Sequence, residues 1–123
     1  MQLTGTIKDA VTNAYIGCAL WTDTDDCDQP SSETPVAEAA AREARQQCTD
    51  FLAECNAHGL LDQYAATGRT WDSFGNDFWL TRNGHGAGFW DRGMGDLGNR
   101  LSEVARSFGE ANVYEADGEL FIA

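Results

Sequence analysis

Lysine is almost absent from this sequence. The 123 residues contain one lysine, Lys8, and seven arginines against 20 aspartates and glutamates, so that the formal net charge is −12 at pH 7. Phosphate groups are bound through lysine and arginine, so this balance argues against direct binding of nucleic acid. A basic protein surface is the complementary partner, while acidity that only keeps the protein soluble is the alternative explanation.

Long apolar runs are also missing. No stretch approaches eighteen apolar residues, and the first ten residues lack a basic flank followed by an apolar segment. We therefore expect neither membrane insertion nor secretion, but a cytoplasmic protein. In a reducing compartment the four cysteines, Cys18, Cys27, Cys48 and Cys55, are expected to be free thiols.

Aromatic residues, in contrast, are plentiful. Four Trp, six Phe and three Tyr in a chain that is 42% hydrophobic are more than a disordered acidic chain would carry. With no internal repeat or linker, residues 1–123 are predicted to form a single domain with its own core.

Apolar spacing predicts three helices in the first half. The stripe Ile7, Val11, Ala14, Cys18 and Trp21 indicates a helix over residues 6–21, with Thr6 as its N-cap. A second helix is predicted from Pro35, capped by Thr34, to Ala57, and Gly59 ends it. A short third helix is expected over residues 60–66.

The second half carries different patterns. Aromatic runs on both sides of Asn83-Gly84 favour a β-hairpin over residues 78–90, with an irregular glycine-rich loop as the alternative. A helix is predicted over residues 96–108, and a second hairpin turns at Asp117-Gly118. The predicted fold class is α+β, with two long helices and a short one followed by hairpin, helix and hairpin. Four short strands would form one small antiparallel sheet packed against the helices.

No metal or cofactor site is predicted. Cys48 and Cys55 would lie two helical turns apart, about 10 Å, which one zinc ion cannot bridge. The acidic run also fails as a calcium loop, because its sixth position is Asp28 rather than glycine and its twelfth is Thr34 rather than glutamate. We interpret this run as a solvated loop that contacts a basic partner, through Asp23, Asp25, Asp26, Asp28 and Glu33.

The glycine-rich aromatic segment is the other candidate site. Polar and charged side chains stand there between bulky aromatic ones, where glycines on both sides of His85 would let a ligand approach closely. The candidate pocket residues are Arg82, Asn83, His85, Trp90, Asp91 and Arg92. The alternative is purely structural: aromatic residues in the core, a local Asp91–Arg92 pair, and glycines serving turns.

The same segment carries a resemblance. Residues 77–93, DFWLTRNGHGAGFWDRG, followed by Leu97-Gly98 and Leu101, resemble the shared core of a family of small proteins encoded by bacteriophages and mobile elements. Ala19-Leu20-Trp21 and the turn near Asp117-Gly118 extend the match over most of the chain. The resemblance implies a phage origin and a bacterial host cytoplasm rather than a mechanism, since the family is mostly of unknown function.

Two functions of different class follow. The first is a phage-encoded interaction protein that occupies a basic, nucleic-acid-binding surface of a host defence protein, such as a restriction or CRISPR effector. The second is a small enzyme or ligand-binding module, with His85 as acid or base and Arg82 or Arg92 holding an anion. The oligomeric state is left open by the sequence.

Overall fold

The protein is an α+β domain in which helices predominate. The structure, a computed structural model, describes residues 1–23 and 35–122, without the side chain of Asp23. Within these residues lie five α-helices, one 3₁₀ helix and one two-stranded antiparallel sheet: α1 (Gly5–Asp23), α2 (Glu38–Ala57), α3 (Leu60–Ala66), α4 (Trp71–Arg82), η1 (Phe89–Asp91), α5 (Asp96–Ser107), β1 (Val113–Ala116) and β2 (Glu119–Ile122).

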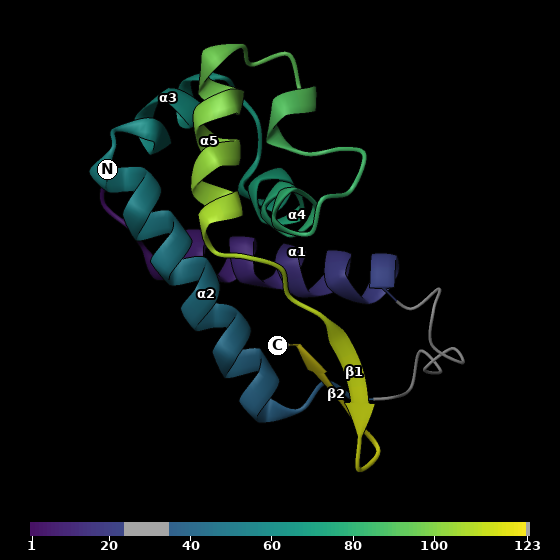
Figure 1. Ribbon diagram of the computed structural model, residues 1–123. Helices are drawn as coiled ribbons and strands as arrows, with labels where there is room; N and C mark the ends of the chain where they lie inside the picture. Colours follow the sequence, from purple (N-terminus) through teal and green to yellow (C-terminus); the bar gives the residue numbers. More distant parts are fainter. Residues whose placement is uncertain (24–34, 123) are drawn as a thin grey trace.

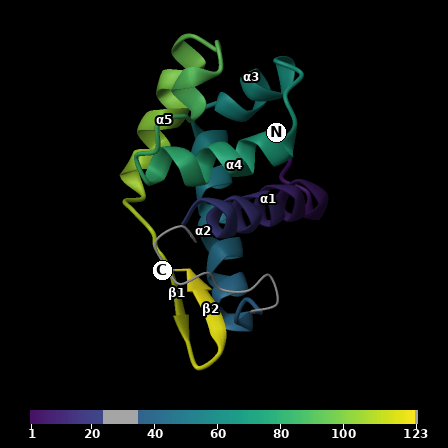
Figure 2. The same ribbon diagram turned by 90° about the vertical axis from the view of Figure 1, so that its right-hand side faces the viewer.

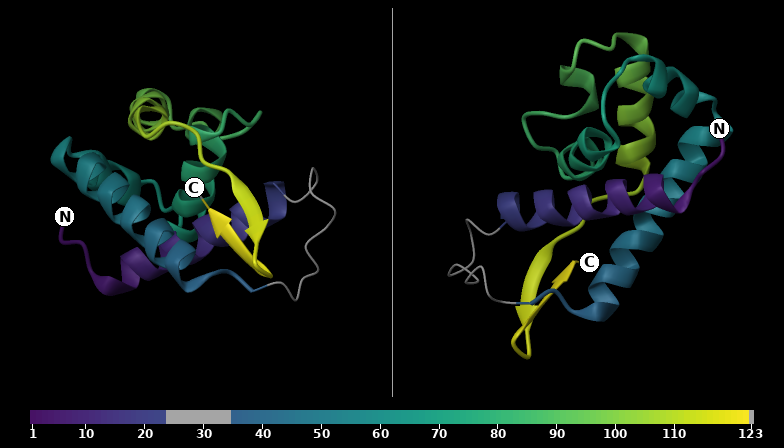
Figure 3. Two further views of the ribbon diagram at one scale, coloured as in Figure 1. Left: turned by 60° about the horizontal axis from the view of Figure 1, so that its bottom comes forward. Right: turned by 180° about the vertical axis from the view of Figure 1, so that it is seen from behind.

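The helices form the body of the molecule and the hairpin projects from one end of it (Figure 1). α1 and α4 run side by side, as the view in Figure 2 shows, and α2 crosses behind both. The hairpin lies against the N-terminal half of α2, where the parallel bridge between Val36 and Leu120 joins it to the chain entering that helix (Figure 3).

The first helix confirms the prediction in extent and corrects it in detail. Its N-cap is Thr4 rather than Thr6, since the Thr4 hydroxyl accepts a hydrogen bond from the Ile7 amide at 3.3 Å. The buried face also differs from the predicted stripe, because Val11, Tyr15 and Ala19 are buried while Trp21 is 82% exposed. The residues of α1 that pack into the core therefore recur every four positions, and one of them is a tyrosine.

The second helix begins later than predicted. Pro35 and Ala37 do not form its first turn, because the Pro35 carbonyl accepts from the Leu120 amide and the Ala37 amide donates to the Leu120 carbonyl, both at 2.9 Å. Pairing with β2 therefore holds this stretch out of the helix, which starts at Glu38. Its end at Ala57, followed by Gly59 with a φ of 69°, is as predicted.

The predicted hairpin over residues 78–90 is wrong, and with it the four-stranded sheet. Residues 71–82 form α4, which Thr70 caps by accepting a hydrogen bond from the Ser73 amide at 3.1 Å. The Asn83-Gly84 pair ends this helix: the Gly84 amide donates to the Thr81 carbonyl and the His85 amide to the Leu80 carbonyl. This pattern is a Schellman motif, in which Gly84 adopts a φ of 69°.

The core is aromatic and centres on α2. The Phe51 ring stacks on Phe78 of α4 with centroids 4.0 Å apart, and Phe74, Phe89 and Phe108 surround this pair. α1 approaches α4 at Gly75, where a Cβ atom would overlap the Val11 carbonyl oxygen. The predicted short helix 60–66, the helix beginning at Asp96 and the C-terminal hairpin are confirmed.

Candidate functional site

The predicted acidic contact surface falls mostly outside the part of the chain that the structure describes. Asp25, Asp26, Asp28 and Glu33 belong to residues 24–34, and Asp23 is the last residue of α1 with its side chain undescribed. Their role in partner binding remains a prediction.

Arg82, the first residue of the predicted pocket, is buried where α4 ends. Its guanidinium donates to the carbonyls of Gly109 and Phe108 at 2.8 and 3.0 Å, to Gln47 Oε1 at 3.1 Å and to Tyr15 Oη at 3.0 Å. Two of these acceptors lie at the C-terminal end of α5, where a positive charge is favoured by the helix dipole. Arg82 thus connects α4 to three other helices, α1, α2 and α5.

Asn83 and His85 follow at the same helix end. The Asn83 amide nitrogen donates to the Trp79 carbonyl at 3.0 Å, and its oxygen accepts from the Ala111 amide at 2.8 Å. This pair of bonds connects α4 to the segment before β1. The half-buried His85 lies just beyond, in the turn that leads to η1.

Arg92 pairs with Asp77 and not with its neighbour Asp91, the partner expected in the purely structural interpretation. Its Nη2 and Nε atoms donate to Asp77 Oδ1 at 2.8 and 3.1 Å, while Asp91 is exposed. The Asp77 side chain is only 1% exposed, and its hydrogen bonds are the main cause that raises the pKa of Arg92. Trp90, beside them, is 42% exposed, so it is not the core residue that the structural alternative assumed.

A pocket of about 270 Å³ opens where Arg82 reaches α1 and α2. Among the six predicted pocket residues, Arg82 alone contributes to its wall. The other lining residues are Tyr15, Glu43, Ala44, Gln47, Phe108, Glu110, Ala111 and Ile122. Sequence reasoning missed them because they come from four separate segments with no common motif.

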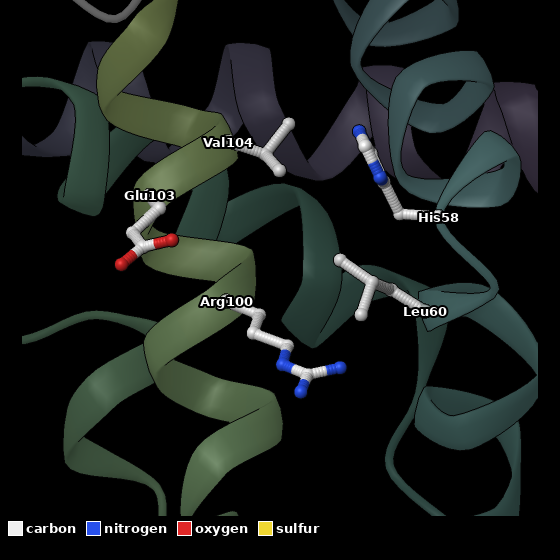
Figure 4. A pocket seen from close by; sticks show the side chains of 5 residues that line it. All are labelled: His58, Leu60, Arg100, Glu103 and Val104. Carbon is white, nitrogen blue, oxygen red and sulfur yellow. The ribbon is translucent and has the colours of Figure 1, made fainter.

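A second hollow of about 320 Å³ lies between α2, α3 and α5. Figure 4 shows Arg100 and Val104 of α5 facing Leu60 and His58 across it, while Glu103 points away from His58. Arg100 pairs with Asp96 at 2.9 Å and the His58 ring contacts Glu54 at 3.2 Å, so the only basic side chain of this hollow already faces a carboxylate.

The C-terminal hairpin combines acidic and aromatic groups. No lysine or arginine follows Arg106, whereas Glu110, Glu115, Asp117 and Glu119 do. On one face of the hairpin Tyr114, 45% exposed, stacks on its cross-strand partner Phe121, with centroids 5.4 Å apart and planes at 15°. Leu120 and Ile122 alternate with Phe121 and are buried, which directs this aromatic pair away from the core.

Two further features concern metals and membranes. No three His, Cys, Asp or Glu residues among those described come together as a metal site. None of the described helices combines the length and apolarity needed to cross a membrane.

We found no match to this chain among protein-family models, curated proteins or solved structures.

Proposed function

We propose that this protein is an acidic interaction module whose C-terminal hairpin binds a basic segment of a partner protein. The observation that carries the proposal is the Tyr114–Phe121 pair, a partly exposed aromatic face that it shares with Glu119, while Asp117 lies at the turn, Glu115 lies on the opposite face and the hairpin has no basic residue. We name these five residues the hairpin surface.

The distribution of ion pairs supports this location. Four arginines outside the hairpin already face carboxylates: Arg42 pairs with Glu38, Arg45 with Asp9, Arg92 with Asp77 and Arg100 with Asp96. The three hairpin carboxylates have no ion pair within the described residues. A cationic partner can therefore approach these carboxylates without first displacing an arginine or lysine of this protein.

The aromatic pair adds binding free energy that the carboxylates alone would not provide. Exposed ion pairs contribute only about 0.2–1 kcal/mol each, so carboxylates steer a partner more than they hold it. Guanidinium groups also stack on tyrosine and phenylalanine rings, which adds about 0.5–1 kcal/mol at exposed sites. An arginine-rich segment would satisfy both requirements at once.

The partner class follows from the resemblance to phage proteins. We propose a host defence protein, such as a restriction or CRISPR effector, whose nucleic-acid-binding surface is basic. The hairpin surface and the acidic residues 23–33 would both face that surface. Such binding should weaken with salt, because exposed charges are screened beyond a Debye length of about 8 Å at physiological ionic strength.

Charge-matched variants test the proposal. The hairpin variant Glu115→Gln/Asp117→Asn/Glu119→Gln removes three charges, and Asp50→Asn/Asp72→Asn/Glu103→Gln removes three exposed charges from α2, α4 and α5. Binding to an arginine-rich peptide is measured by titration calorimetry, with a glutamine-substituted peptide as control. We expect the hairpin variant to bind about tenfold more weakly and the control variant within about twofold of the parent. Equal losses for both variants would reject the hairpin as the binding surface.

A further inference from the structure

The pocket beside Arg82 holds a buried positive charge without a carboxylate. Arg82 is 6% exposed, and no aspartate or glutamate among the described residues lies within ion-pair distance of it. A guanidinium has five N–H groups, and four of them are used in the hydrogen bonds to Tyr15, Gln47, Phe108 and Gly109. One Nη2 hydrogen has no acceptor among the described residues, and Arg82 lines the pocket.

Tyr15 offers a second donor at the same place. Its hydroxyl oxygen accepts from Arg82 Nη1 at 3.0 Å, and no described acceptor receives the hydroxyl hydrogen. Burial is the largest influence on this group and raises the pKa of Tyr15 to about 12, so the hydroxyl keeps its hydrogen at neutral pH. A neutral donor next to a cation is a suitable arrangement for a carboxylate.

The rest of the wall has the opposite chemistry. Glu43 of α2 and Glu110 after α5 are exposed carboxylates that line the pocket, and the Gln47 amide donates to Glu43 at 3.3 Å. Ile122 and Phe108 supply apolar surface between these groups. The pocket therefore places a buried cation, an acidic rim and an apolar wall around one space.

We propose that this pocket binds a free aliphatic amino acid. Its carboxylate accepts hydrogen bonds from the spare Arg82 N–H and the Tyr15 hydroxyl, and its ammonium group faces Glu43 and Glu110. Its side chain packs on Ile122 and Phe108. The pocket volume of about 270 Å³ has room for a molecule of this size.

A simple anion fits the same site less well. The rim carboxylates repel a molecule that carries only negative charge, whereas a zwitterion presents a charge of the correct sign to each end. Capping of α5 by Arg82 accounts for the bonds to Phe108 and Gly109 but uses neither the spare N–H nor the Tyr15 hydrogen.

Leucine and its two half-analogues test the ligand class. NMR titrations compare leucine with 4-methylpentanoate, which lacks the ammonium group, and 3-methylbutylamine, which lacks the carboxylate. We expect leucine at millimolar concentration to shift the resonances of Ala111 and Ile122, and to bind at least about fivefold more tightly than either analogue. No shift with leucine, or equal binding of 4-methylpentanoate, would overturn the proposal.

Two variants test the residues. Tyr15→Phe keeps the ring in the core and removes only the hydroxyl, and we expect leucine to bind about tenfold more weakly. Glu43→Gln/Glu110→Gln should abolish the preference for leucine over 4-methylpentanoate, while the control Glu103→Gln should leave it intact. If Tyr15→Phe fails to fold, Glu43→Gln/Glu110→Gln still tests the proposal. An unchanged preference of this variant for leucine over 4-methylpentanoate would contradict the proposed site.

The site is independent of the proposed partner binding. The hairpin variant Glu115→Gln/Asp117→Asn/Glu119→Gln should bind leucine as the parent does, so failure of one proposal leaves the other standing.

Discussion

Removing Arg92 should destabilise the fold far more than removing an exposed arginine. Asp77 is 1% exposed, and Arg92, which is 30% exposed at its side chain, neutralises it through two nitrogens. Arg92→Met keeps the aliphatic stem but leaves a buried carboxylate without its counter-charge, a change that costs about 3–5 kcal/mol. For a domain of this size we expect a fall in melting temperature of about 12–20 °C.

Urea unfolding, followed by tryptophan fluorescence, measures this loss against two controls. Arg100→Met breaks the exposed pair with Asp96 and should cost no more than about 1 kcal/mol. Asp77→Asn/Arg92→Met removes the buried charge together with its partner, so it should be more stable than Arg92→Met alone. Equal losses for Arg92→Met and Arg100→Met, or a double variant that is the least stable of all, would show that Asp77 does not depend on Arg92 for its counter-charge.

Three further predictions concern the core. Gly75→Ala should lower the free energy of unfolding by about 1–3 kcal/mol, because its methyl group would overlap the Val11 carbonyl oxygen; an unchanged urea midpoint would contradict the close approach of α1 and α4. Cys48 and Cys55 are fully buried and burial raises the pKa of both thiols, so a thiol reagent should modify them only as fast as the protein unfolds; rapid modification of the native protein would count against this packing. Burial also raises the pKa of Tyr15 from 10.0 to about 12 and of Cys48 from 9.0 to about 12. The stability that these two groups contribute to the folded protein in their neutral forms is therefore present below pH 9 and is lost between pH 9 and 12. The loss should reach about 3 and about 4 kcal/mol respectively, and urea unfolding at successive pH values would show a flat profile if these groups were not buried.

Sequence patterns that are compatible with only one local structure were predicted correctly. The helix ending before Gly59, the short helix after it and the turn at Asp117-Gly118 are confirmed because each depends on a few neighbouring residues. Asp117 and Gly118 both have positive φ, as a two-residue hairpin turn requires.

The segment 78–90 was mispredicted because its sequence patterns are compatible with two local structures. Asn83-Gly84 suits a hairpin turn and a helix end equally, and aromatic residues favour strands while also fitting a helix whose buried side faces other rings. The choice was made by tertiary contacts, namely the stacking of Phe78 on Phe51 and the close approach at Gly75.

The site was predictable only in part for a related reason. Arg82 was recognised as a candidate by its residue type, but its partners Tyr15, Gln47 and Phe108 are distant in sequence and share no spacing pattern with it. The hairpin surface had a visible signal, the absence of any basic residue after Arg106, which sequence reasoning passed over.

The most direct test of the central claim, that the hairpin surface binds a basic segment, is an NMR titration of the isotope-labelled protein with an arginine-rich peptide at low and at high salt. We expect the largest chemical-shift changes at Tyr114 and Phe121, and we expect these changes to shrink as salt is raised. Changes centred on the helices, or changes at the hairpin that are indifferent to salt, would contradict this claim.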